Sequence, residues 1–191
     1  MFVSSDRGNS WRPTAPGRDL TKGTAGERPD VLTAIAVSPS QSDSIYTGSS
    51  QGQAMVSRDG GSSWKPITSG LVNRFIKSIM VAPTDPNTAY ITFSGFKAGH
   101  VFKTTDGGEN WTDISGDLPD TPVNALLIDP VDQNIIYIGT DVGVFRSTVN
   151  GRFWERFNDG LPSVPVTGFA VRSDNTIQLA TFGRGAYELI R

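Results

Sequence analysis

Few residues of this chain have the type and spacing that catalysis or metal binding requires. His100 is the only histidine among the 191 residues, and the chain contains no cysteine. A metal site needs several converging ligands, and none cluster at metal-binding spacing. No serine lies in a nucleophile-elbow context, and no glycine-rich loop leads from a strand into a helix to hold phosphate. We therefore expect no catalytic residue, no metal and no cofactor, with His100 at a strand edge or in a loop.

Paired carboxylates are the remaining candidates for chemistry, because glycoside hydrolysis requires two of them across a cleft. Asp85 in APTDPN and Asp129 in IDPVDQN stand beside prolines, where the capping of a turn explains them. Asp120 in LPDTP and Asp141 in GTDVGV fall in loops that the strand repeat below brings to one face. They are either a carboxylate pair or two solvated loop residues, and the sequence favours the second interpretation.

An eight-residue motif that ends in tryptophan recurs four times and organises the chain. The copies are SSDRGNSW (4–11), SRDGGSSW (57–64), TTDGGENW (104–111) and STVNGRFW (147–154). These copies contain all four tryptophans of the chain. A repeat at this period indicates that one supersecondary unit is used again and again.

Apolar strands recur in step with the motif. Strand A of each unit reads LTAIAVSP (32–39), IKSIMVAP (76–83), VNALLIDP (123–130) and VTGFAVRS (166–173). Strands B and C follow, and strand D starts at the tryptophan. Four short strands in such a unit are typical of a β-propeller blade, and stacked blades bury each other's apolar faces. We predict an all-β propeller of four-stranded antiparallel blades that begin near residues 31, 75, 122 and 166.

The motif lies between strands C and D, so we expect it to form a hairpin turn. Asp106 can accept hydrogen bonds from nearby backbone N–H groups, and Gly107 and Gly108 can adopt positive φ. Trp111 can then cover the seam between two sheets. The residues expected to serve the scaffold in this way are Asp6, Gly8, Trp11, Asp59, Gly61, Trp64, Asp106, Gly108, Trp111, Gly151 and Trp154.

The pattern S/T-x-D-x-G-x-x-W resembles the Asp-box, or bacterial neuraminidase repeat. This repeat occurs in sialidases, xyloglucanase-type glycoside hydrolases, sortilin-like receptors and photosystem-assembly propellers. Three copies match it fully, whereas the fourth has Val149 in place of the aspartate, with Asn150 as a candidate substitute. The resemblance implies boxes at the periphery of the blades, away from any active centre. A sialidase would also have a Phe-Arg-Ile-Pro motif and a tyrosine nucleophile. The motif is missing, and Tyr46, Tyr90 and Tyr137 recur as expected core residues, so we do not expect sialidase activity.

Three blades are complete in the sequence, and a fourth is divided between the chain ends. The C-terminal part supplies strands A to C of that blade, and residues 1–15 supply part of a strand C and a strand D. We therefore predict one domain, 1–191, with three whole blades and one composite blade. Three assemblies stay open: a closed four-bladed ring, a homodimer or higher assembly that completes a larger ring, and a fragment of a longer propeller. The duplicated strand C and a start inside strand C favour the last two.

A ligand is expected on the face formed by the B–C and D–A loops, opposite the Asp-box hairpins. Exposed aromatic residues beside polar donors suit a sugar or a peptide partner. The candidate ligand-binding residues are Arg74, Phe75, Phe96, Lys97, His100, Asp120, Asp141 and Arg184. Arg18 and Gln51 also map to this face. Phe75 and Phe96 have an alternative role, which is to pack under their own loops.

The remaining features of the sequence concern the long irregular segment, the possible binding partners and the cellular location. Residues 12–30 form the longest irregular stretch, either a flap over the loop face or a linker. A net charge of −2 gives no attraction to nucleic acid or anionic membranes. No apolar run is long enough to span a membrane, and no signal peptide is visible. The ending TFGRGAYEL (181–189) resembles the closing blade of exported bacterial Asp-box propellers, which implies a secreted or periplasmic protein.

These observations together predict a non-catalytic propeller that acts as a binding or assembly module for a glycan or a protein. One alternative is a C-terminal fragment of a xyloglucanase-like glycoside hydrolase, with its catalytic carboxylates partly in missing blades. The other alternative is a purely structural repeat unit that associates with itself.

Overall fold

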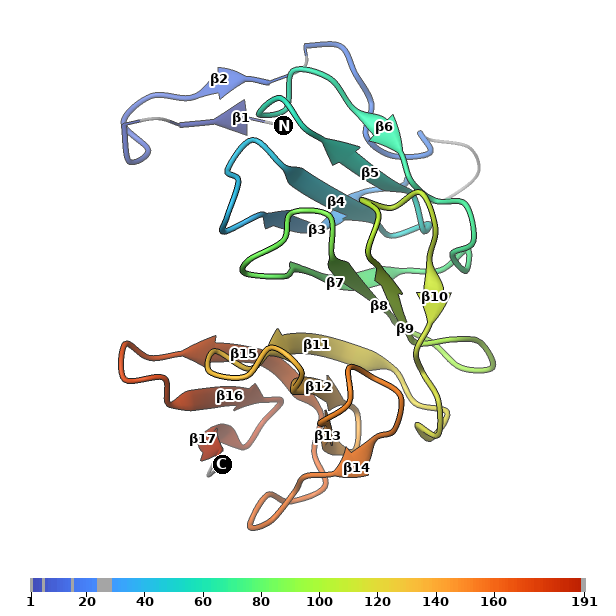
Figure 1. Cartoon of the computed structure of the whole chain (residues 1–191), viewed down its shortest axis with the longest axis vertical. Coiled ribbons are helices and arrows are strands. Elements are labelled where there is room, and N and C mark those ends of the chain that lie inside the picture. Colours follow the sequence, from blue (N-terminus) through green and yellow to red (C-terminus); the bar gives the residue numbers. More distant parts are fainter. Residues whose placement is uncertain (1, 5, 15, 24–28, 190–191) are drawn as a thin grey trace.

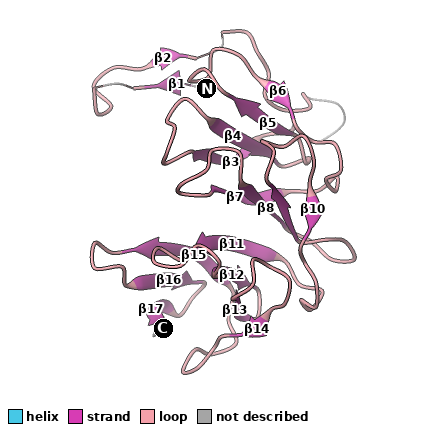
Figure 2. Ribbon diagram, in the orientation of Figure 1, coloured by secondary structure: helices cyan, strands magenta, loops and turns pink. Residues whose placement is uncertain are grey.

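The computed structural model of the chain describes residues 2–4, 6–14, 16–23 and 29–189. Every regular element in this part is a β-strand (Figures 1 and 2), and the strands form five antiparallel sheets. None of the described residues belongs to a helix that is long and apolar enough to cross a membrane. The predicted all-β class and the four-stranded antiparallel blades are thus confirmed.

Three sheets are complete blades, each with its strands in sequence order. The first comprises β3 (Leu32–Val37), β4 (Ile45–Ser49), β5 (Ala54–Ser57) and β6 (Lys65–Pro66). The second comprises β7 (Ile76–Val81), β8 (Ala89–Phe93), β9 (Val101–Thr104) and β10 (Thr112–Asp113). The third comprises β11 (Val123–Ile128), β12 (Ile136–Thr140), β13 (Gly143–Ser147) and β14 (Glu155–Arg156). We call these blades 1, 2 and 3.

The two chain ends form smaller sheets that stay separate. β1 (Phe2–Val3) pairs with β2 (Arg12–Pro13), and we call this pair with its turn the N-terminal hairpin. β15 (Val166–Val171), β16 (Ile177–Thr181) and β17 (Gly185–Leu189) form a three-stranded sheet, the last blade. Figure 1 shows the N-terminal hairpin in the upper part of the molecule and the last blade in the lower part. Among the described residues no strand pairing joins these two sheets, so the composite blade that we predicted from both ends is not formed there within one chain. Residues 1, 5 and 15 of that prediction lie outside the described residues.

The core lies between the blades, because each sheet packs against the next. The second strand of every complete blade is buried along its whole length, as expected for a strand covered on both faces. Gly48 in β4 and Gly139 in β12 permit this close stacking. A Cβ on Gly48 would lie 2.4 Å from Ile76 of blade 2, and one on Gly139 would lie 2.6 Å from Val166 of the last blade.

Three apolar clusters fill the seams between successive blades. Tyr46 and Tyr137 are among the largest fully buried side chains, and Tyr90 is also buried, as the repeat predicted. The Tyr46 hydroxyl donates to the Pro86 carbonyl of blade 2 at 2.7 Å, so its polar end is satisfied across the seam. Residues of blade 1 and blade 2 share one cluster, those of blades 2 and 3 share the next, and blade 3 shares the third with the last blade.

Candidate functional site

The Asp-box of blade 2 closes a tight turn by a short network of hydrogen bonds. The Thr104 hydroxyl donates to Asp106 at 2.8 Å and accepts from the Gly108 N–H at 2.9 Å. Asp106 accepts the backbone N–H of Asn110 at 2.9 Å. Gly107 and Gly108 both have positive φ, of 76° and 94°. The N-terminal hairpin and blade 1 contain the same bonds at equivalent positions.

The acidity of the box aspartates follows from these bonds. The pKa of Asp6, Asp59 and Asp106 is lowered to about 2. In each case the largest cause is hydrogen bonding from the residue four positions later in the chain, which stabilises the charged carboxylate. A carboxylate held in this way at an exposed turn is a structural acceptor.

The fourth box closes its turn without an aspartate. Ser147 still accepts the N–H of Gly151 at 2.8 Å, although Val149 stands at the aspartate position. Asn150, the candidate substitute, adopts φ 56° where blade 2 has Gly107, and its amide donates to Asn134 at 2.9 Å. Asn150 thus takes the place of a glycine and bonds the turn to a neighbouring loop. It does not stand in for the box aspartate, contrary to our expectation.

The box tryptophans of blades 2 and 3 bind the preceding blade. The Trp111 indole donates to the carbonyl of Ile67 at 2.8 Å, and the Trp154 indole donates to the carbonyl of Ile114 at 2.9 Å. Trp154 is 7% exposed and belongs to the cluster between blades 2 and 3. These two boxes therefore fasten one blade to the blade before it.

The two N-terminal boxes differ from this arrangement. The indoles of Trp11 and Trp64 donate to a carbonyl of their own turns, Gly8 at 3.2 Å and Gly61 at 2.9 Å. Trp64 is nevertheless only 5% exposed, because Leu20 packs on it. Trp11 is 63% exposed.

On the loop face, the structure brings Lys97, His100 and Asp120 together. Asp120 accepts the Lys97 backbone N–H at 2.7 Å, and its carboxylate lies 3.1 Å from Nε2 of His100. His100 is buried, and its backbone N–H donates to the Ser115 hydroxyl at 2.7 Å. Asp120 therefore joins the B–C loop of blade 2 to the linker that leads into blade 3.

Arg74, Phe75 and Phe96 lie in the same region. The Ser94 N–H donates to the Phe75 carbonyl at 3.0 Å, and the Arg74 guanidinium reaches within 2.7 Å of a Cβ built on Gly95. Phe96 is 54% exposed and Phe75 is also exposed, so neither is packed under its loop. Lys77 lies 5.7 Å from the Phe75 ring centroid, close enough for a cation–π contact.

Asp141 and Arg184 stand apart from this group. Asp141 accepts the Asn124 amide at 2.8 Å, and no contact among the described residues joins it to Asp120. Arg184 is exposed in the β16–β17 loop, beside Phe182, which is 76% exposed. The sequence analysis missed Phe182, although its place in a B–C loop matches that of Phe96.

The irregular segment packs on blade 1 where it is described. Arg18 donates to the Trp64 carbonyl at 2.6 Å, so it lies beside a box and away from the loop face to which we assigned it. Asp30 is buried and accepts bonds from Lys22, Ser49 and two further groups, which anchors the loop of blade 1. The sequence analysis did not single out Asp30. Residues 15 and 24–28 of this segment lie outside the described residues.

The described part of the chain contains no group of three or more His, Asp or Glu side chains that could hold a metal ion. The loop face thus offers aromatic rings, cationic side chains and hydrogen-bonded carboxylates as its binding groups. These groups can stack on and pair with a ligand, and their arrangement around Asp120 is fixed by backbone contacts.

Comparison with known families identifies the chain. The family model Sortilin-Vps10, described as sortilin, neurotensin receptor 3, matches residues 52–182. The chain belongs to this family. The match to the Sortilin-Vps10 family spans most of the chain and includes the Asp-boxes of blades 1 and 2 and the Val149 variant in blade 3. The resemblance to sortilin-like Asp-box propellers is therefore confirmed. None of the curated proteins matches this sequence.

Solved structures show the same fold at low identity. An ancestral GH74 enzyme has a TM-score of 0.72 and 23% identity, over 94% of this chain and 24% of its own. The extracellular domain of BT4673 from B. thetaiotaomicron has a TM-score of 0.65 and 16% identity, over 90% of this chain and 22% of its own. YCF48 bound to D1 peptide has a TM-score of 0.58 and 16% identity, over 90% of this chain and 57% of its own. This member of the Sortilin-Vps10 family thus spans about a quarter of the first two proteins and somewhat over half of the third.

Proposed function

We propose that the chain is a non-catalytic binding module whose loop face takes an acidic peptide segment with an apolar side chain. The observation that carries the proposal is the recurrence of a cation within two residues of an exposed phenylalanine along the chain: Arg74 beside Phe75, Lys97 beside Phe96, and Arg184 near Phe182. Aromatic residues and arginines dominate the energetics of protein interfaces. The cations suit carboxylates, and the rings suit an apolar side chain.

Two of the compared proteins support a peptide as the ligand class. The description of the matched family names neurotensin receptor 3, and the YCF48 structure is of a complex with D1 peptide. A glycan was the other ligand class that the sequence left open. The three cations favour the peptide over a neutral sugar, because a neutral sugar offers them no opposite charge.

The glycoside hydrolase alternative has less support from this geometry. Asp120 is engaged by His100 and the Lys97 N–H, and Asp141 is engaged by Asn124. Each carboxylate is therefore occupied by a hydrogen bond to a neighbouring loop or strand, which is a structural role. The likeness to a GH74 enzyme rests on 23% identity and concerns the fold.

We further propose that the chain works outside the cytoplasm, in a secreted or periplasmic setting. The compared BT4673 structure is an extracellular domain, and the chain contains no cysteine to be oxidised there. Fractionation of cells that express the full natural protein would test this, with recovery in the cytoplasm as the contrary result.

A peptide library tests the binding proposal, with a glycan array as the comparison. We expect selection of peptides that combine aspartate or glutamate with an aromatic or large aliphatic residue. Phe96→Ala should weaken binding of a selected peptide by at least tenfold. Phe153→Ala, at an equally exposed phenylalanine in the box of blade 3, is the matched control and should leave binding unchanged. Selection of glycans alone, hydrolysis of xyloglucan, or equal effects of the two variants would contradict the proposal.

A further inference from the structure

At each seam between complete blades, the Asp-box of one blade makes the same three contacts with the blade before it. The indole donates to the carbonyl of the third residue after the previous tryptophan, which is Ile67 or Ile114. The second box glycine packs on the same residue: a Cβ on Gly151 would lie 2.5 Å from Ile114. A turn glycine of the preceding blade lies against the tryptophan: a Cβ on Gly116 would lie 3.7 Å from the Trp154 ring.

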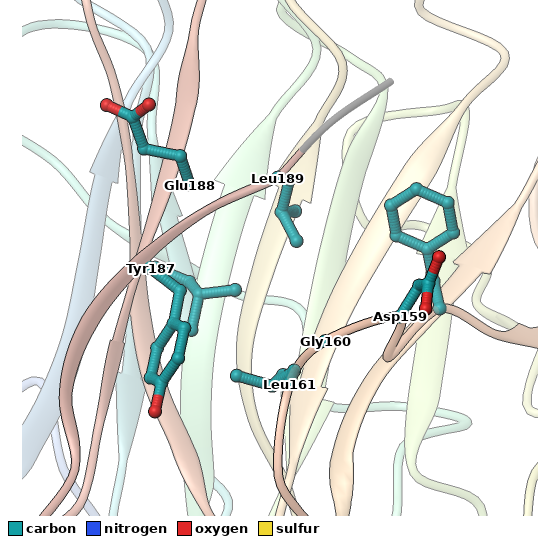
Figure 3. A pocket seen from close by; sticks show the side chains of 8 residues that line it. Asp159, Gly160, Leu161, Tyr187, Glu188 and Leu189 are labelled. Atoms are coloured by element: carbon teal, nitrogen blue, oxygen red, sulfur yellow. The ribbon is translucent and has the colours of Figure 1, made fainter.

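After blade 3, a pocket lies where the next box would make these contacts. It has a volume of about 410 Å³ and is lined by Phe157, Leu161, Leu179, Tyr187 and Leu189, among others. Figure 3 shows Tyr187 and Leu189 of β17 beside Leu161 of the loop that enters the last blade. Phe157 is the third residue after Trp154 and so corresponds to Ile114. The turn glycine here, Gly160, has no atom within 4 Å of its built Cβ.

The N-terminal hairpin has the complementary surface and leaves it open. Its box is fully formed, yet Trp11 is 63% exposed, whereas Trp154 is 7% exposed. Among the described residues, a Cβ on Gly8 would meet the ring of its own Trp11, at 3.8 Å, and no residue of another blade. The hairpin thus presents, unpacked, the same glycine and indole that fasten blades 2 and 3. An exposed ring of this size at a preformed turn is a typical interface anchor.

The strand edges and their charges match as well. β17 pairs only with β16, so its other edge has unpaired backbone groups among the described residues. In blade 3 the same edge pairs Phe145 with Arg156 and Arg146 with Glu155, and the Arg146 side chain bonds Glu155 at 2.7 Å. The equivalent register places Tyr187 opposite Pro13 and Glu188 opposite Arg12.

That register sets opposite charges directly across the two strands, which stabilises antiparallel pairing. Glu188 is exposed, as is Arg12. The pocket lining also carries Asp159 and the hairpin turn carries Arg7, so the two surfaces differ in sign of charge at these positions as well. Both ends of the chain therefore match in shape, hydrogen-bonding edge and charge.

We propose that two copies of this chain associate head to tail, with the N-terminal hairpin of one copy completing the last blade of the other. β2 becomes strand D beside β17, Trp11 enters the pocket, and its indole donates to the Phe157 carbonyl. Because the two surfaces of the interface differ, a rotation that closes gives a ring and one that does not gives a filament. Two copies with four blades each close an eight-bladed ring. This inference is independent of the peptide proposal and rests on other residues.

The pairing requires β2 to exchange its present partner, because β17 and β1 cannot occupy the same edge. Within the described residues, β1 contributes two residue pairs, Phe2 with Pro13 and Val3 with Arg12. Phe2 is itself exposed, so the release of β1 uncovers little apolar surface. Strand addition to a free sheet edge is a common mode of recognition and gains backbone hydrogen bonds along the strand.

Mass measurement by light scattering and sedimentation on the 191-residue chain tests the proposal. We expect association to twice the 20.5 kDa chain mass, with a blue shift of tryptophan emission as concentration rises. Trp11→Ala should weaken association at least tenfold while the dilute monomer stays folded, because Trp11 is exposed there. Phe153→Ala removes an equally exposed ring from the box of blade 3 and is the matched control.

Charge exchange gives a second, sharper measurement. Arg12→Glu and Glu188→Arg should each weaken association, and the double variant should restore it, because the pair is then reversed. A chain that stays monomeric throughout the micromolar range would overturn the proposal. So would a Trp11 ring that is already buried in the monomer, an unchanged dimer in Trp11→Ala, or a double variant no better than its parents.

Discussion

The Asp-boxes of the N-terminal hairpin and of blade 3 use related turns, but they act in different surroundings. The blade 3 box keeps its turn even without an aspartate and buries Trp154 against blade 2. The N-terminal box has the full set of turn bonds, yet its Trp11 is exposed. The hydrogen bonds within the turn therefore determine the conformation of the box. The box stabilises the fold only where its tryptophan also packs on the preceding blade. Variants that act on one box and spare the other can separate these two contributions.

The largest expected difference is between the two tryptophans. Trp154→Ala removes a buried ring and an inter-blade hydrogen bond, so we expect it to lower the free energy of unfolding by about 3–5 kcal/mol. Trp11→Ala removes an exposed ring and should change it by less than about 0.5 kcal/mol. Urea denaturation at low protein concentration measures both. Equal losses in the two variants would contradict an inter-blade role for Trp154.

The two box glycines form a closely matched pair. Gly151 and Gly8 have φ of 87° and 89°, so an alanine meets the same backbone strain at either position. Only at Gly151 would the added Cβ also press on Ile114 of blade 2. We expect Gly151→Ala to be more destabilising than Gly8→Ala by about 1–3 kcal/mol, the usual range for overpacking. Thermal unfolding compares them, and indistinguishable melting temperatures would count against close packing at this seam.

Lowering the pH should destabilise the folded protein because it protonates the box aspartates. The folded pKa of Asp59 and Asp106 is about 2, below the ordinary value of 3.8, so each contributes stability above pH 3.8. This contribution is lost as the pH falls from about 4 towards 2, because the unfolded state takes up protons first. Asp106→Asn should therefore reduce the acid dependence of unfolding.

The same substitution in the N-terminal box is the control for the acid experiment. Asp6 also has a pKa of about 2, but the tryptophan of its box is 63% exposed instead of packed across a seam. We expect Asp6→Asn to leave the acid dependence of global unfolding nearly unchanged in the dilute monomer. A pH titration followed by circular dichroism reads out both variants, and an identical change in the two would show that the hairpin unfolds with the blades.

The smallest expected effect concerns an ion pair across the first seam. Lys65 of β6 bonds Glu109 in the box of blade 2, and both side chains are more than half exposed. A double-mutant cycle with alanine at each position should give a coupling of about 0.2–1 kcal/mol that decreases in high salt. A coupling of several kcal/mol would mean that charge, rather than indole packing, fastens this seam.

The repeated elements could be predicted from the sequence because their signals are local. Strand A of each blade was located from its apolar run, and β7 and β11 begin at the expected Ile76 and Val123. The box turns follow from hydroxyl, carboxylate and glycine spacing. Buried Tyr46 and Tyr137 followed from their fixed place in the repeat.

What the sequence missed depends on long-range packing. Arg18 carries no local signal that it would reach the Trp64 carbonyl, and Asp30 gives no sign of the hydrogen bonds that bury it. The separation of the two chain ends depends on how each sheet is oriented to the next, which no short pattern encodes. For the same reason, the candidate ligand-binding residues of the loop face do not form one group. Asp141 bonds within its own blade, whereas Asp120 bonds the Lys97 N–H.

Hydrogen exchange of the four indole N–H groups, followed by NMR, tests most directly whether the boxes fasten one blade to the blade before it. In the dilute monomer we predict slow exchange for Trp111 and Trp154, whose donors are bonded across a seam, and fast exchange for Trp11. Fast exchange at Trp111 and Trp154, or protection at Trp11 equal to theirs, would contradict the account.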